Sequence, residues 1–149
     1  MRSEQKEFLE RRLREAAEKQ PEIKLLANLL VELGGQFLVA PPGADFYISN
    51  LLEFGFVMSG PVQLNIMRAN SCHQNVSLLW KDRKLGMVGI GTGYALSDDG
   101  LWRRHSWGVL REGIVETTDN RVKYFGLLLQ GSRASQFADR NSSGTSESD

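Results

Sequence analysis

The sequence predicts an α+β fold, with helices first and an antiparallel sheet after them. Its 149 residues are the size of one domain. Apolar residues recur at helical spacing over the first 33 residues, whereas after residue 86 the apolar runs are short, rich in branched and aromatic residues, and separated by turn signals. Consecutive strands joined by tight turns are antiparallel. We therefore expect an N-terminal helical segment over 1–33, an α+β domain over 34–130 and a disordered tail over 131–149.

Two helices are expected in the N-terminal segment. Ser3 is a suitable N-cap for the first, and Pro21 should end or restart it because proline lacks the amide hydrogen that an inner helical turn needs. The second helix should stop at Gly34 and Gly35. The first helix is mostly charged, so we expect it to lie against the domain or against a second copy, which makes this segment a candidate for homo-oligomerisation.

A further helix should carry the single cysteine, Cys72. Asn70 or Ser71 is a suitable cap, and the charged turn over 81–84 should end the helix. His73 is expected on its surface. We expect this helix to pack on a sheet of about four or five strands, over 87–90, 94–96, 102–110, 113–118 and 122–129, while 45–52 fits a short helix and a strand equally well.

Composition excludes several classes of protein. Lys plus Arg and Asp plus Glu are 18 each, which argues against nucleic acid or an anionic membrane as the main partner. One cysteine excludes disulfide scaffolds and Cys-x-x-Cys zinc sites. The chain shows no secretory signal and no membrane-spanning stretch, so the cytoplasm is the expected compartment. The tail has six Ser among nineteen residues and only Ala134, Phe137 and Ala138 as apolar residues, which predicts disorder.

Three short motifs suggest nucleophilic chemistry. Cys72 in the first turn of a helix meets the positive end of the helix dipole, which favours the thiolate. A cysteine nucleophile needs an imidazole within reach, and a polar group that orients the imidazole. His105, in His-Ser-Trp, and Glu116, in Val-Glu-Thr-Thr, are on two successive predicted strands.

This order of motifs resembles the transglutaminase-like division of the papain-like cysteine hydrolases. In that division a His-Ala-Trp strand precedes a strand with an Asp followed closely by Pro-Thr. The resemblance covers about residues 60–126 and implies a papain-like core, with Cys72 as nucleophile, His105 as general base and acid, and Glu116 as the orienting group. The sequence differs in having Glu where Asp is usual and in the short segment between His105 and Glu116.

The short segment introduces an alternative orienting group. If Glu112 and Gly113 form a two-residue hairpin turn, His105 lies opposite Asn120, and Glu116 is roughly 13 Å away along the strand. Asn120 is therefore a second candidate, and an Asn in this role is also known in the papain-like group.

Other residues are candidates for binding the reacting carbonyl group or the substrate. The backbone N–H of Cys72 is one donor for an oxyanion, and Gln63 or Asn65 is a candidate for the other, since papain-like enzymes use a Gln upstream of the cysteine. Trp107 follows His105 by two residues in the His-Ser-Trp motif and is a further candidate for substrate binding. Cys72, His73 and His105 are not expected to form a metal site, because adjacent ligands on one helical turn diverge.

Two functions fit these residues. The first is a small cysteine-dependent hydrolase or acyltransferase that acts on an amide or thioester of a small molecule or peptide through a Cys72 acyl-enzyme and requires no cofactor. The alternative is a non-catalytic binding or assembly module that uses its N-terminal helices for oligomerisation. The hydrolase predicts an accessible thiol in a cleft with His105, and the module predicts a buried, inert thiol.

Overall fold

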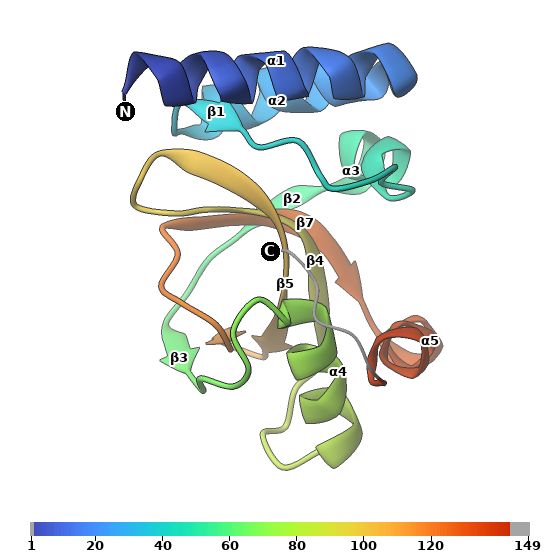
Figure 1. Ribbon diagram of the computed structural model, residues 1–149. Coiled ribbons are helices and arrows are strands. Elements are labelled where there is room, and N and C mark those ends of the chain that lie inside the picture. The colour runs from blue at the N-terminus through green and yellow to red at the C-terminus, as the bar shows by residue number, and fades with distance from the viewer. Residues whose placement is uncertain (1, 144–149) are drawn as a thin grey trace.

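The protein contains one mixed β-sheet with helices packed against it, which confirms the predicted α+β class (Figure 1). The computed structural model describes residues 2–143. The helices in that range are α1 Ser3–Lys19, α2 Glu22–Leu33, α3 Ile48–Phe54, α4 Cys72–Asp82 and α5 Gly131–Asn141. The strands are β1 Phe37–Leu38, β2 Phe56–Met58, β3 Val62–Leu64, β4 Gly89–Leu96, β5 Leu101–Leu110, β6 Gly113–Glu116 and β7 Lys123–Leu129. No helix within residues 2–143 is long and apolar enough to cross a bilayer.

The sheet has more strands than expected and is not purely antiparallel. Its order is β2-β7-β4-β5-β6-β3, and β1 pairs with β5, which makes seven strands. β4, β5 and β6 are antiparallel neighbours in chain order, as predicted, but β7 returns to pair with β4. β1 and β3 run parallel to β5 and β6. The additional strands have two or three residues, which is too short to give a recognisable period in the sequence.

Two predicted strands, 87–90 and 94–96, form one continuous strand, β4. Gly91 and Gly93 lie between the two predicted runs, within this strand. A β-carbon at Gly91 would collide with the indole of Trp107 on β5. The glycines therefore allow close contact within the sheet and do not end the strand.

The N-terminal helices begin and end close to the expected positions. α1 ends at Lys19 and α2 begins at Glu22, so Pro21 separates them as predicted. α1 begins at Ser3 with Arg2 in the cap position, one residue before the predicted cap. The chain turns away after α2 at Gly34 and Gly35, as predicted. Gly35 has a φ of 73°, in the left-handed region that favours glycine.

The N-terminal segment shares its core with the sheet. α1 has no buried residue, whereas α2 buries Ile23, Leu26, Ala27 and Leu30. Figure 1 shows α1 and α2 stacked above one end of the sheet. The α2 residues belong to the same hydrophobic cluster as Tyr94, Trp102 and Phe125 from the strands and Ile48 and Leu51 from α3, the segment for which helix and strand had been equally plausible.

Helix α5 occupies part of the predicted disordered tail. Residues 131–141 are helical, with Ala134, Phe137 and Ala138 buried on one side. Phe137 and Ala134 pack with Val76 of α4 and Ile90 of β4. Three apolar residues at spacings of three and four are enough to bury one stripe when a helix docks on a ready surface, although the composition of the segment is polar. Residues 144–149 of the predicted tail lie outside the described range.

Candidate functional site

His105 and Glu116 form a buried pair inside the sheet. His105 Nε2 lies 2.8 Å from Glu116 Oε1, and both side chains are fully buried. The hydroxyl of Tyr124 donates to Glu116 Oε1 at 2.9 Å, while the main-chain N–H and hydroxyl of Thr118 donate to Oε2 at 2.9 and 3.1 Å. The carboxylate therefore accepts bonds from β5, β7 and the segment that follows β6, and this holds the imidazole of His105 in one orientation.

The hairpin between β5 and β6 differs from the predicted one. Leu110 pairs with Gly113, so Arg111 and Glu112 form the turn, and the predicted pairing of Arg111 with Ile114 is wrong. Gly113 belongs to β6 because it pairs with Leu110, and glycine fits there because a β-carbon would collide with the carbonyl oxygen of Pro61.

The corrected register explains how Glu116 reaches His105. Gly108 pairs with Val115, so the next pair would place Trp107 opposite Glu116, with His105 two residues farther along. Glu116 is then a diagonal neighbour of His105, within reach of long side chains, and the 13 Å separation does not arise. Asn120 is exposed, and its main-chain N–H donates to Asp119 Oδ1 at 2.8 Å. The contact to His105 Nε2 comes from Glu116.

The surroundings of Glu116 keep it ionised. Burial alone would raise the pKa of Glu116, but the hydrogen bond and charge of His105, the N–H of Thr118 and the charge of Arg121 lower it to about 2. Burial and the neighbouring Glu116 carboxylate raise the pKa of Tyr124, so its hydroxyl remains a donor. His105 Nδ1 is buried and has no hydrogen-bond partner among the described residues. The two ring nitrogens of His105 therefore differ, since a carboxylate holds Nε2 and no hydrogen bond from the described residues reaches Nδ1.

Cys72 is the first residue of α4, as the cap residues predicted. It is fully buried, so the accessible thiol that the hydrolase predicts is not found in this structure. Ser71 occupies the cap position, but its hydroxyl donates to the carbonyl of Ala69 at 3.3 Å. Cys72 Sγ lies 3.7 Å from His73 Nδ1. His73 is only 9% exposed, so its predicted surface position is wrong. The reason is that α4 is covered on more than one side, by the sheet and by α5.

His73 is connected to a chain of buried polar groups. Its Nδ1 lies 2.6 Å from Ser106 Oγ, which lies 2.8 Å from Thr92 Oγ1. Arg104 Nη1 donates to Thr92 Oγ1 at 2.8 Å, and Arg104 Nε lies 3.4 Å from an Asp45 carboxylate oxygen. This chain links α4 to β4, β5 and the loop before α3.

The polar chain disfavours a proton on His73. Burial lowers the pKa of His73 well below its ordinary value of 6.5, and the charges of Arg104 and His105 lower it further. His73 therefore stays neutral at physiological pH. His105 and Ser106 are consecutive on β5, so they project from opposite faces of the strand and engage Glu116 and His73 separately.

The sequence missed most residues of this chain. Tyr94 also belongs to the chain, because its hydroxyl donates to Asp45 Oδ2 at 2.8 Å. Thr92, Tyr94 and Arg104 are strand residues that come together only through the pairing of β4 with β5. The one available signal was period-two spacing, which puts Arg104 and Ser106 on the same face of their strand.

The remaining predicted site residues lie near the His105–Glu116 pair but have different surroundings. Gln63 is exposed on β3 opposite Val115. Asn65 follows β3, and its main-chain N–H donates to the carbonyl of Glu116 at 2.8 Å. Trp107 is fully buried, with Nε1 lying 3.4 Å from Met58 Sδ and its ring stacked 6.1 Å from that of His105. Trp107 therefore supports His105 from within the core and offers no exposed surface to a substrate.

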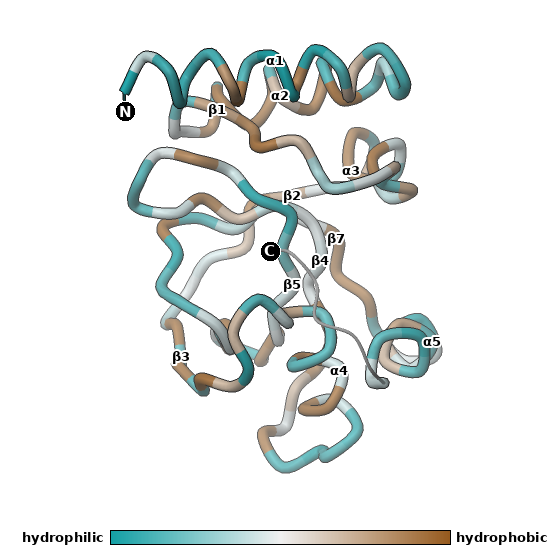
Figure 2. Tube along the Cα trace, viewed as in Figure 1, coloured by the Kyte–Doolittle hydropathy of each residue, from teal (hydrophilic) through white to brown (hydrophobic). Residues whose placement is uncertain are grey.

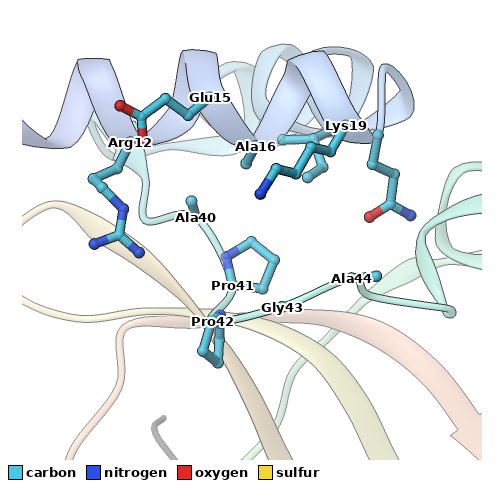
Figure 3. A pocket seen from close by; sticks show the side chains of 11 residues that line it. Arg12, Glu15, Ala16, Lys19, Ala40, Pro41, Pro42, Gly43 and Ala44 are labelled. Atoms are coloured by element: carbon cyan, nitrogen blue, oxygen red, sulfur yellow. The ribbon is translucent and has the colours of Figure 1, made fainter.

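Two surface cavities differ in their relation to these residues. A pocket of about 250 Å³ lies between α1 and the loop over 40–44, where Arg12 and Lys19 point toward Pro41 and Pro42, and no candidate site residue lines it (Figure 3). A wider hollow of about 410 Å³ includes Ala69, Asn70 and Thr118. The hollow thus adjoins both the segment before Cys72 and the residue that donates to Glu116. The rest of its lining is charged or polar: Ser97, Asp98, Asp99, Arg103, Asp119 and Arg121.

Comparison with protein families, curated proteins and solved structures finds no match to this chain. Within residues 2–143, no three side chains of the His, Cys, Asp and Glu types are grouped so as to hold a metal ion. The geometry around Cys72, His105 and Glu116 is therefore the basis for a functional argument.

Proposed function

We propose that the protein is a cysteine-dependent hydrolase or acyltransferase that acts on an amide or thioester, with Cys72 as nucleophile. The observation that carries the proposal is the state of His105. Its Nε2 is held by an ionised Glu116, and its Nδ1 is buried without a partner among the described residues. A general base in a cysteine triad needs this asymmetry between its two ring nitrogens.

The mechanism requires the start of α4 to move Cys72 to His105, because its sulfur lies 3.7 Å from His73 Nδ1, and His73 contacts Ser106 on the face of β5 opposite His105. In the first half of the reaction, His105 Nδ1 then takes the thiol proton of Cys72. The thiolate attacks the substrate carbonyl carbon, and the carbonyl electron pair moves to oxygen, where the N–H groups at the start of α4 stabilise the negative charge. When the tetrahedral intermediate collapses, the amine or thiol leaves and takes the proton from His105. The product of this step is an acyl group on Cys72.

In the second half, His105 removes a proton from water or from an acceptor amine. The resulting nucleophile attacks the acyl carbon, and Cys72 leaves as a thiolate that recovers the proton. Glu116 remains ionised throughout, because it orients the ring and stabilises the imidazolium without accepting its proton. Water as acceptor gives hydrolysis, and an amine gives acyl transfer.

His73 is the histidine that contacts Cys72 in the structure, but its surroundings argue against a role as base. Its Nδ1 is engaged by Ser106 at 2.6 Å, and burial lowers its pKa. The assignment of His105 agrees with the resemblance to the transglutaminase-like division of the papain-like hydrolases. We propose this membership as part of the same hypothesis.

The test is the pH dependence of Cys72 alkylation by iodoacetamide, followed by mass spectrometry. We expect the wild-type thiolate to form well below the reference pKa of about 8.5. His105→Ala should remove this shift, whereas the matched variant His73→Ala should retain it. An unshifted profile that His105→Ala leaves unchanged would contradict the hydrolase.

One observation favours a second candidate, a non-catalytic binding or assembly module. Cys72 is fully buried, which is the state expected of an inert thiol and requires a substrate to displace part of its cover. α1 has no buried residue, and its Phe8 is 47% exposed, so this helix has a surface for a partner or second copy. The module predicts slow alkylation at every pH together with a concentration-dependent oligomer that Phe8→Glu dissociates in sedimentation experiments.

A further inference from the structure

Strand β3 has an open edge on the sheet. It is the last strand in the order and, within residues 2–143, pairs only with β6. The N–H of Ile114 donates to the carbonyl of Pro61 at 2.9 Å, and the N–H groups of Asn65 and Met67 donate to the carbonyls of Glu116 and Thr117 at 2.8 Å. The main-chain N–H and C=O groups of the odd-numbered residues in this segment therefore point toward β6. Because main-chain groups alternate along a strand, those of Val62, Leu64 and Ile66 face outward.

The open edge is apolar as well as unpaired. The side chains of Val62, Leu64 and Ile66 are 42%, 49% and 59% exposed. Figure 2 shows hydrophobic stretches along β3 at the margin of the molecule. No charged residue occurs from 61 to 67, although natural proteins commonly protect an exposed edge with charges. Outward main-chain groups and alternating apolar side chains are the two features that bind an added strand.

The edge leads directly to the candidate site. The segment after β3 is bonded to Glu116 and Thr117 through the main chain of Asn65 and Met67. It then passes the hollow lined by Ala69 and Asn70 and reaches Cys72 at the start of α4. A strand paired along 62–66 would therefore continue toward the hollow lined by Ala69 and Asn70, which precede Cys72 in the sequence.

The size of the edge favours a peptide over a second copy of the chain. β3 has three residues, whereas a stable interface between proteins needs roughly 20 to 30 residues on each side. A short extended segment needs only a few main-chain bonds and two or three side-chain contacts. Such weak, sequence-tolerant binding suits a substrate that must be released after reaction.

We infer that the outer edge of β3 docks the substrate of Cys72 as an extended peptide with apolar side chains at alternate positions. The inference rests on the proposed hydrolase or acyltransferase function and narrows its substrate class to peptides. Main-chain bonds to Val62, Leu64 and Ile66 align the peptide, and their side chains contact its apolar residues. The scissile amide then lies beyond Ile66, toward the hollow.

The test measures binding separately from catalysis. It uses the full chain with Cys72→Ala and a fluorescein-labelled hexapeptide of alternating Val and Thr, followed by fluorescence anisotropy. Leu64→Lys should weaken binding by about tenfold or more, because a charge disrupts the apolar edge. Leu64→Pro should do the same by removing one outward N–H. The matched control is Val57→Lys on β2, the opposite edge, where the side chain is 40% exposed and binding should not change.

Two further peptides, each N-methylated on one alternate set of nitrogens, test the main-chain bonds. Methylation of the set that faces β3 should weaken binding, and methylation of the other set should not. Equal effects of both sets, equal effects of Leu64→Lys and Val57→Lys, or no saturable binding would overturn the inference. So would a dimer that Leu64→Lys dissociates without changing peptide binding, since a second copy would then occupy the edge.

The peptide-binding experiment and the alkylation experiment can fail independently of each other. Leu64→Lys leaves Cys72, His105 and Glu116 in place and should preserve the pH profile of alkylation. If the profile shows no dependence on His105 but the peptide binds at β3, the catalytic proposal fails while the edge remains a peptide-binding site. If the profile depends on His105 but no peptide binds, only the docking inference fails.

Discussion

The two histidines of this chain lie in contrasting surroundings on opposite sides of β5. His105 contacts a carboxylate through Nε2, and its other nitrogen has no partner among the described residues. His73 contacts the hydroxyl of Ser106, which is connected through Thr92 to the guanidinium of Arg104. A proton on His105 would face a negative charge, and a proton on His73 would lie in a buried chain that ends in a positive charge.

This contrast shows that proximity to a cysteine does not by itself assign a catalytic role. His73 adjoins Cys72 in sequence and lies 3.7 Å from its sulfur, yet burial and the charges of Arg104 and His105 lower its pKa. His105 is 33 positions away in the sequence and has the partner that a general base requires. The two histidines differ in the groups that surround each ring: a carboxylate contacts His105, and a hydroxyl chain that leads to a guanidinium contacts His73.

The largest expected effect is on the His105 side. Glu116→Ala would leave His105 Nε2 and the Tyr124 hydroxyl buried without their acceptor, so we expect a loss of about 3 to 5 kcal/mol of unfolding free energy. Glu116→Gln keeps the shape and one acceptor and should cost less. Urea unfolding of both variants measures the difference. Equal, small losses would show that the pair contributes little to stability.

The second expected effect is acid sensitivity. The folded-state pKa of Glu116 is about 2, below the ordinary value of 4.5, so its stabilisation is complete above about pH 5 and disappears as the pH falls through 2. The size of this contribution is on the order of 3 kcal/mol. Urea unfolding at a series of pH values should show a decline in the wild type that Glu116→Gln reduces. The same decline in both proteins would assign it to other carboxylates.

The third effect tests the His73 side. Ser106→Ala removes the contact to His73 Nδ1 and one partner of Thr92, which we expect to cost about 1 to 3 kcal/mol. The alkylation profile of Cys72 should be unchanged, because the Glu116–His105 pair is intact. A change in the profile comparable to that of His105→Ala would assign the base function to the Ser106–His73 side.

The smallest effect is a second pH dependence, near neutrality. The folded chain resists protonation of His73 while the unfolded chain binds a proton below about pH 6.5. Stability should therefore be constant above that pH and fall as the pH drops below it. Denaturation midpoints between pH 7.5 and 5.5 measure this, with His73→Gln as the variant that flattens the curve. A wild-type curve already flat in this range would contradict the assigned surroundings of His73.

The fold illustrates where local sequence signals are sufficient. Pro21, Gly34 and the cap before Cys72 placed three helix boundaries within one or two residues, because caps and helix breakers act through neighbouring backbone groups. The short strands β1, β2 and β3 were missed, since two or three residues carry no period. Helix α5 was missed because its composition is polar, and its stability comes from docking on α4 and β4.

The sequence by itself determined the α+β class, the helix that begins at Cys72 and the order of the candidates Cys72, His105 and Glu116. Only the tertiary structure decided that Glu116 and not Asn120 contacts His105, because a two-residue shift in one hairpin changes every cross-strand neighbour. It also decided that His73 is buried and that the edge of β3 is open. Local propensity depends on adjacent residues, whereas burial, strand register and edge exposure depend on segments brought together from across the chain.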